Sequence, residues 1–165
     1  MMTLSKMVSM PIAIAALVLF ASSALFAHEG EHNDGPFSSS EPAVSEINAV
    51  LTGYASEVAK SNVDGMANYV IQSDAFSIIE GSHANWGWAD YRDNHLKPEF
   101  SSDKFKITAF NISDIRVSVA GDVAYATFKS KIEFTLDGEA KSNDGMDTAI
   151  LVKTKDGWRI RHMHS

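Results

Sequence analysis

The sequence predicts an α+β domain, with helices in the first half of the domain and an antiparallel sheet in the second half. Two observations support this fold class. Apolar residues recur at spacings of four, three and four in the segment that follows Pro42, which places them on one face of a helix: Ile47, Leu51, Tyr54 and Val58. Residues 105–165 instead contain runs of alternating apolar and polar residues that are divided by turn signals.

The remaining elements of the first half follow in order. Pro42 suits the first turn of the first helix. The segment NVDGMANYV predicts a second, shorter helix that is entered through Asp64, and DAFSIIEG after it predicts a short strand. The segment WADYRDNHLKPEF predicts a further helix in which Trp88, Tyr91 and His95 share one face.

The second half predicts an antiparallel meander. FKITAFNISDIRVSVAG is a strand that ends at a tight turn over residues 120–122, and the return strand alternates so that its even-numbered apolar residues from Phe128 to Leu136 share one side. LDG ends that strand, DTAILVKTK forms the next, and DG at 156–157 leads into WRIRHMHS. Unbroken alternation in this last strand would place Trp158, Ile160, His162 and His164 on one face, and Arg159, Arg161, Met163 and Ser165 on the other.

The N-terminal residues differ from the domain. Residues 1–27 carry Lys6 and then an apolar run that ends in small residues, which predicts a secretory signal peptide cleaved after Ala24 or Ala27 and a periplasmic or secreted protein. The alternative is an uncleaved membrane anchor, although the run is short for a span of about 20 residues. Residues 28–41 contain His28 and His32 among Gly, Ser and acidic residues and predict a flexible linker, whose histidines could bind copper or zinc loosely. The domain then covers residues 42–165.

Composition excludes several classes of function. A chain of 165 residues with 45% hydrophobic residues is long enough for one domain with a core. The formal net charge of -7 argues against binding to nucleic acids or to anionic membranes. Because the chain has no cysteine, it has neither a disulfide framework nor a thiolate nucleophile, and any metal would need His, Asp or Glu ligands.

Four segments carry a resemblance to a known family: the closing GWRIRHMHS, the earlier IIEGSHANWGW and DYRDNHL, and NVDGMANYV followed by DAFSIIEG. From Glu46 to Ser165 the chain resembles the NTF2-like superfamily, in particular its SnoaL-like, DUF4440-type branch. The resemblance implies a cone in which helices pack on a strongly curved antiparallel sheet, with a pocket between them and a homodimer formed through the outer sheet face. Members include isomerases, dehydratases, polyketide cyclases and binding proteins, so the fold alone leaves the function open.

The resemblance and the residue pattern together give the candidate site. The isomerase and cyclase members use an acidic or histidine base, yet Asp64, Asp74 and Asp90 fall at helix starts or turns, where capping is expected. The catalytic residues therefore stay unassigned. The predicted pocket residues are aromatic residues and histidines of the predicted helix, of the loop before it and of the last strand: His83, Trp86, Trp88, Tyr91, His95, His162 and His164. The alternative is that these histidines and aromatic residues belong to the core, with each buried imidazole bonded to a protein partner.

Three functions are consistent with these residues. The first is the binding of a small molecule against Trp86, Trp88, Tyr91 and Phe128, oriented by the histidines. The second is a metal site held by His83, His95, His162 and His164, since an H-x-H pair on one strand face can ligate one ion. The third is an enzyme that uses a histidine for acid–base catalysis. The sequence identifies no cofactor.

Overall fold

The structure, a computed structural model, describes residues 37–165. The predicted signal peptide and most of the predicted linker, with His28 and His32, lie outside the described residues. Within residues 37–165, no helix is long and apolar enough to cross a membrane.

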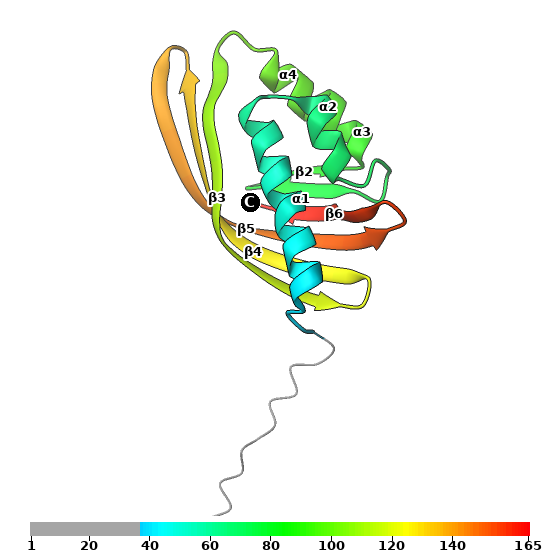
Figure 1. Ribbon diagram of the computed structural model, residues 1–165. Helices are drawn as coiled ribbons and strands as arrows, with labels where there is room; N and C mark the ends of the chain where they lie inside the picture. Colours follow the sequence, from blue (N-terminus) through cyan, green and yellow to red (C-terminus); the bar gives the residue numbers. More distant parts are fainter. Residues whose placement is uncertain (1–36) are drawn as a thin grey trace, which may run out of the picture. The chain divides into compact units, whose positions relative to one another are not determined.

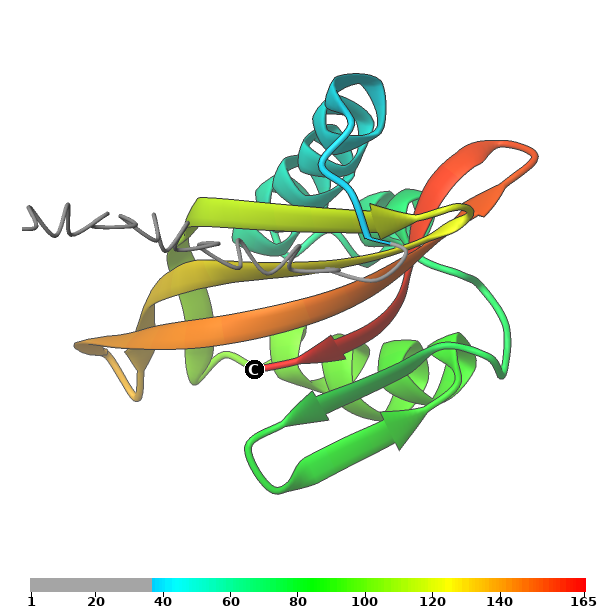
Figure 2. The same ribbon diagram turned by 90° about the horizontal axis from the view of Figure 1, so that it is seen from below.

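The described residues form one six-stranded sheet with helices lying inside its curve (Figure 1). The strand order is β2-β1-β6-β5-β4-β3, and every neighbouring pair is antiparallel except β1 and β6, which are parallel. Three long strands make most of the sheet, while β1 and β2 form a short hairpin at one end (Figure 2). The strands are β1 Ser77–Glu80, β2 His83–Trp86, β3 Phe105–Ala120, β4 Val123–Leu136, β5 Glu139–Thr154 and β6 Gly157–His164. This architecture confirms the predicted α+β cone.

The helices also confirm the prediction, with differences in detail. They are α1 Glu41–Ala59, α2 Val63–Met66 followed by the 3-10 turn Ala67–Tyr69, and a third helix made of α3 Trp88–Asp90, the π-helical turn η2 Tyr91–Leu96 and α4 Lys97–Phe100. Asn62, rather than Asp64, caps α2, because its side chain accepts a hydrogen bond from the Gly65 N–H at 3.1 Å. Pro98 has no N–H to donate, which interrupts the regular α-helical ladder next to the wide turn.

The core lies between α1 and the concave face of the sheet. The predicted helix face is buried as expected, with Ile47 fully buried and Tyr54 4% exposed. The inward face of β4 carries Ala124, Ala126 and Phe128, all buried, which confirms the predicted alternation of that strand. These residues lie opposite the inward residues of β5 in a regular antiparallel register.

The last strand departs from the prediction at one residue. Ile150 of β5 pairs with His162, but Leu151 pairs with Ile160, so Arg161 is an additional residue in a β-bulge. A bulge reverses the alternation beyond it. Trp158 and Ile160 are buried as predicted, whereas Met163 enters the core and His162 and His164 lie on the outer face. The predicted placement of both histidines on the apolar face, and of Met163 on the opposite face, is therefore wrong.

The bulge has a visible anchor and a structural role. The Arg161 Nη1 donates a hydrogen bond to the carbonyl oxygen of Ala75 at 2.6 Å, which ties the bulge to the segment before β1. Beyond it, residues 162–164 gain β1 as a parallel neighbour. The bulge therefore marks the point beyond which β6 pairs with β1 as well as with β5.

Two segments are more regular than the sequence indicates. His83 and Trp86, predicted in a loop, belong to β2. β5 begins at Glu139 and includes EAKSNDGM, a stretch of low strand propensity that pairs residue by residue with the far half of β4. The turn before it is tight, with Asp137 and Gly138 both at positive φ (51° and 85°), as a two-residue hairpin requires.

Candidate functional site

A cavity of about 340 Å³ lies between the helices and the concave face of the sheet. Its wall is largely apolar and aromatic, and a smaller group of polar residues lies along β1, the end of the third helix and β5. The apolar and aromatic residues are Tyr54, Val58, Met66, Ile78, Tyr91, Leu96, Phe100, Ile107, Phe110, Ile132 and Met163. The others are Glu80, Gly81, Glu99, Ser130, Asn143, Asp144, Gly145, Asp147 and Ser165. An apolar wall with a small number of polar groups that can orient a ligand is typical of small-molecule sites.

Glu80 is the polar group at the β1 side of the cavity. It lies two residues after the buried Ile78, on the same face of the strand. The Tyr91 hydroxyl donates to its Oε1 at 3.4 Å, while the buried Oε2 accepts no hydrogen bond from the described residues. Burial raises the pKa of Glu80, with a further contribution from the nearby Glu99, and the imidazole of His95 opposes the shift.

Two tyrosines keep their protons beside this carboxyl group. Burial raises the pKa of Tyr54 and of Tyr91 well above the usual value, and the negative charge of Glu80 acts in the same direction. Both phenols are therefore neutral at physiological pH and can donate a hydrogen bond to a ligand or to a carboxylate.

His95 lies behind Glu80 and Glu99, outside the cavity wall. Its Nε2 is 3.1 Å from Glu99 Oε2, and its Nδ1 is 3.1 Å from Asn85 Oδ1 and 3.4 Å from Glu80 Oε2. The hydrogen bond with Glu99 raises the pKa of His95, as does the charge of Glu80, while partial burial opposes them. His95 therefore orients two cavity acids and does not itself line the cavity.

Asp147 is the polar group on the sheet side. It lies on the inward face of β5 opposite Phe128, is 3% exposed, and its Oδ1 has no hydrogen-bond partner among the described residues. Burial raises the pKa of Asp147, and the Ser130 hydroxyl and His164 oppose the shift. Gly145 has no side chain to crowd this carboxyl group. A Cβ at that position would lie 2.7 Å from Ser130 Oγ and 3.2 Å from Asp147 Oδ1.

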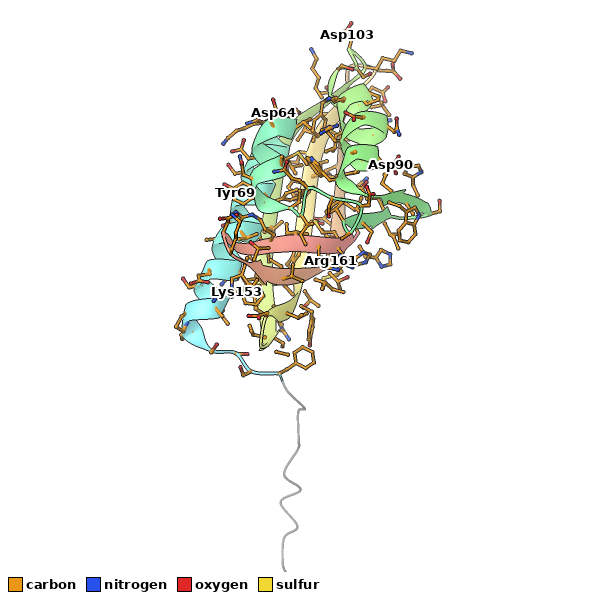
Figure 3. All side chains as sticks on the ribbon, turned by 90° about the vertical axis from the view of Figure 1, so that its right-hand side faces the viewer. Asp64, Tyr69, Asp90, Asp103, Lys153 and Arg161 are labelled. Carbon is orange, nitrogen blue, oxygen red and sulfur yellow. The ribbon has the colours of Figure 1, made fainter. Side chains whose placement is uncertain are left out.

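The other acids of the first half belong to the surface. Asp90 accepts hydrogen bonds from Asn94, Asn85 and the Trp86 N–H, which lower its pKa. Figure 3 places Asp64 and Asp90 at α2 and at the start of the third helix, and neither lines the cavity. Of the two expected caps, Asp90 accepts the Trp86 N–H at the start of the third helix, whereas α2 is capped by Asn62 and not by Asp64.

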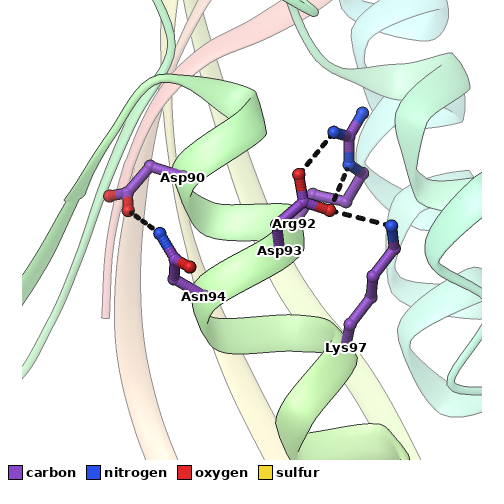
Figure 4. Close-up of polar contacts among 5 residues, drawn as sticks. All are labelled: Asp90, Arg92, Asp93, Asn94 and Lys97. Atoms are coloured by element: carbon purple, nitrogen blue, oxygen red, sulfur yellow. Dashed lines mark hydrogen bonds and ion pairs between the residues drawn. The ribbon is translucent and has the colours of Figure 1, made fainter.

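The outward side of the third helix carries its own polar network (Figure 4). Asp93 accepts hydrogen bonds from Arg92 Nε and Lys97 Nζ, each at 2.8 Å, and Asn94 reaches back to Asp90. The guanidinium of Arg92 and the ammonium of Lys97 lower the pKa of Asp93. These exposed pairs give the helix a solvated face, which leaves the face with Tyr91 and Leu96 for the cavity.

The structure separates the predicted site residues into four groups. Tyr91 lines the cavity. Trp88 is core, packing edge-to-face on Phe76 with ring centroids 5.7 Å apart. His83 and His95 form a pair near the surface, with ring centroids 5.5 Å apart.

The remaining three lie on the outer face of the sheet. Trp86 is 70% exposed, and Ser77 lies between Trp86 and His162 in the strand register. The Nδ1 of His162 is 2.8 Å from Ser77 Oγ, and His164 is exposed. The predicted convergence of four histidines in one concavity is therefore wrong. β2, which carries His83, is the edge strand beyond β1, and the bulge places His162 and His164 on the outer face of the sheet.

The histidines also do not meet as metal ligands. Among residues 37–165, no three His, Cys, Asp or Glu side chains are grouped so that they could hold a metal ion. His83 with His95, and His162 with His164, remain two separate pairs.

Sequence reasoning missed the four acids of the cavity, although signals exist for Asp147 and Glu80. Asp147 precedes Ala149 and Leu151 at alternate spacing, so the inward parity of β5 already includes it. Glu80 has the same relation to Ile78. Both escaped because an acid at the end of an apolar alternation is normally assigned to the solvent.

Comparison with known proteins gives the family. Residues 47–165 match the SnoaL-like domain family, so the chain belongs to that family. No curated protein matches the sequence. The fold is shared with many solved structures.

Three of these structures illustrate the likeness. An NTF2-like superfamily protein from Salmonella enterica serovar Typhimurium has a TM-score of 0.67 and 20% identity, covering 74% of this chain and 89% of that one. A ketosteroid isomerase-like protein from Erwinia carotovora atroseptica has a TM-score of 0.62 and 14% identity, covering 76% and 95%. An NTF2-like protein with a cystatin-like fold from Novosphingobium aromaticivorans has a TM-score of 0.60 and 16% identity, covering 74% and 80%. At such identities the likeness shows the fold alone.

Proposed function

We propose that this protein binds a small, largely apolar molecule in the cavity between its helices and its sheet. The observation that carries the proposal is the pair of buried carboxyl oxygens, Glu80 Oε2 and Asp147 Oδ1, which have no hydrogen-bond partner among the described residues and belong to cavity-lining side chains. A buried polar atom without a partner costs about 1–3 kcal/mol, and a ligand that bonds it recovers that cost. Tyr54 and Tyr91 add hydrogen-bond donors beside Glu80.

The volume limits the ligand. A cavity of about 150 Å³ holds one benzene molecule, and this cavity measures about 340 Å³. The space suits a molecule with one or two rings, or one ring with a short chain.

A blocking variant tests this use of the cavity. Ile132→Trp places a bulky ring in the wall of the cavity, so it should abolish the binding of ring-sized ligands found by screening thermal stabilisation of the protein. Lys131→Trp is the matched control, because it adds the same side chain at the adjacent, exposed position of β4. Ligands that stabilise wild type and Ile132→Trp equally would show that they bind elsewhere and would contradict the proposal.

Acid–base catalysis is a second candidate, favoured by the raised pKa values of Glu80 and Asp147 in one cavity. Such groups can take a proton from a carbon next to a carbonyl group and return it. A cyclic ketone such as 2-tetralone, incubated with the protein in D₂O, would then exchange its α-protons faster than in buffer alone. Asp147→Asn or Glu80→Gln should remove the acceleration if the carboxyl group transfers the proton.

We further propose that the chain is exported and that the domain works after removal of residues 1–24 or 1–27. The support is the sequence pattern of those residues alone. Mass mapping of protein from the host should find an N-terminus at His28 or Leu25, and an intact Met1 would contradict export with cleavage.

A further inference from the structure

The ionisable side chains of Asp, Glu, Lys, Arg and His type that line the cavity are all acidic. Glu80, Glu99, Asp144 and Asp147 contribute carboxyl groups to its wall, while no lysine, arginine or histidine of residues 37–165 lines it. The imidazoles whose charge favours the ionised acids are His95 and His83 for Glu80 and His164 for Asp147. All three lie outside the cavity wall, and His95 is already bonded to Glu99. The wall therefore carries acidic groups without a basic side chain among the described residues.

Two of these acids each have one buried oxygen that accepts no hydrogen bond from the described residues. Asp147 is 3% exposed and its Oδ1 is unpartnered, and Glu80 Oε2 is buried without a hydrogen bond. Burial raises the pKa of both groups because their ionised forms lose water and gain no ammonium or guanidinium group in exchange. A positive charge in the cavity would supply that partner. A carboxylate or phosphate ligand would meet like charge instead.

Aromatic rings line the same space. Tyr54, Tyr91, Phe100 and Phe110 all contribute to the cavity wall. Ring faces attract organic cations, and the attraction is larger where water is excluded. Carboxylates and aromatic rings therefore favour the same class of ligand.

We propose that the ligand of the cavity is a small organic cation, namely a protonated amine attached to an apolar body of one or two rings. This inference rests on the proposed function and names the ligand class for the same cavity. The ammonium group would bond Asp147 or Glu80, and the ring would pack among Phe100, Phe110 and the aliphatic side chains. Amides and alcohols of the same size would fill the space without compensating the carboxylates.

Three probes of nearly equal size test the inference on the whole protein: 2-phenylethylamine, 2-phenylethanol and 3-phenylpropanoate. Titration calorimetry at pH 7.5 should give a Kd for the amine at least about tenfold lower than for the alcohol, with the carboxylate weakest. An alcohol or carboxylate that binds as tightly as the amine would overturn the cationic class while leaving the proposed function standing. If none of the three binds at millimolar concentration, the proposed function fails together with this inference.

Variants identify which carboxyl groups bind the amine. Asp147→Asn and Glu80→Gln should each weaken the amine at least about fivefold and leave the Kd of the alcohol within twofold. Asp156→Asn, which removes the same charge from the exposed turn before β6, should leave all three Kd values unchanged. Equal weakening of the amine by all three variants would mean that only the net charge of the protein matters, and would overturn the assignment.

Discussion

Asp147 shows how a single residue can be costly for the fold and useful for a site. A buried carboxyl group without a full set of partners is destabilising, and proteins retain such groups where function requires them. Its neighbours Ser130 and His164 compensate in part, and Gly145 leaves open space beside it. Glu80, at the other side of the cavity, resembles Asp147 only at its buried Oε2, since its side chain is partly exposed and Tyr91 and His95 lower its pKa.

The raised pKa of Asp147 has a consequence for stability. The folded state holds this proton more tightly than the unfolded chain, so stability falls as the pH rises from the ordinary pKa of 3.8 through the raised value. Asp147→Asn cannot ionise and should gain stability over wild type across that window, which urea titrations between pH 3.5 and pH 8 would measure. Asp156→Asn at the exposed turn is the control and should not reproduce the gain. A constant difference between wild type and Asp147→Asn at every pH would contradict the expectation.

At the level of elements, sequence patterns predicted most of the fold. The helix periodicity of α1, the alternation in β4 and the turns at Gly121, Gly138 and Gly157 are local features, so they can be recognised without tertiary information. The bulge at Arg161 and the strand character of residues 139–146 depend on neighbouring strands. No local pattern encodes them.

The dependence on neighbouring strands also explains which site residues were predicted correctly and which were not. The prediction of inward His162 and His164 followed from uninterrupted alternation, and one extra residue in the strand reversed it. Tyr91 was identified correctly as a cavity residue because the helix spacing that places it is local. Glu80 could have been found by extending the strand alternation to the end of β1, and Asp147 by extending the alternation of Ala149 and Leu151 back by one inward position.

The reversed parity of β6 gives a direct test by mutation. Met163→Ala should lower the free energy of unfolding by about 2–5 kcal/mol, since it removes a buried side chain. His164→Ala, at the exposed neighbouring position, should cost less than about 1 kcal/mol. Denaturant titration of both variants distinguishes the bulged strand from a regular one, for which the order of the two losses would be reversed.

At the level of the whole molecule, the sheet has two faces with different properties. The concave face is covered by the helices and forms the cavity, while the outer face exposes apolar side chains that include Tyr125 and Ile150, directly paired across β4 and β5 and 44% and 40% exposed. Neighbouring His162 and Trp86 continue this face toward β2. Exposed apolar residues in one continuous area are typical of a surface that meets another protein.

We therefore expect the homodimer that the family resemblance implies to use this outer face. Light scattering at tens of micromolar protein should give twice the chain mass, and Ile150→Glu should halve it by placing a charge in the contact. Lys155→Glu adds the same side chain in the turn before β6 and should leave the mass unchanged. A wild-type mass equal to one chain would contradict this expectation.

The extra residue in β6 also bears on how such a protein can diversify. Loss of the single codon for Arg161 would restore regular pairing with β5. Because Ile160 would then be followed directly by His162, the two histidines would stay on the outer face and Met163 would stay in the core. The deletion would also remove the hydrogen bond from Arg161 to the carbonyl oxygen of Ala75. A bulge is therefore a position at which a strand can lose one residue without any change in the side chains that face its cavity.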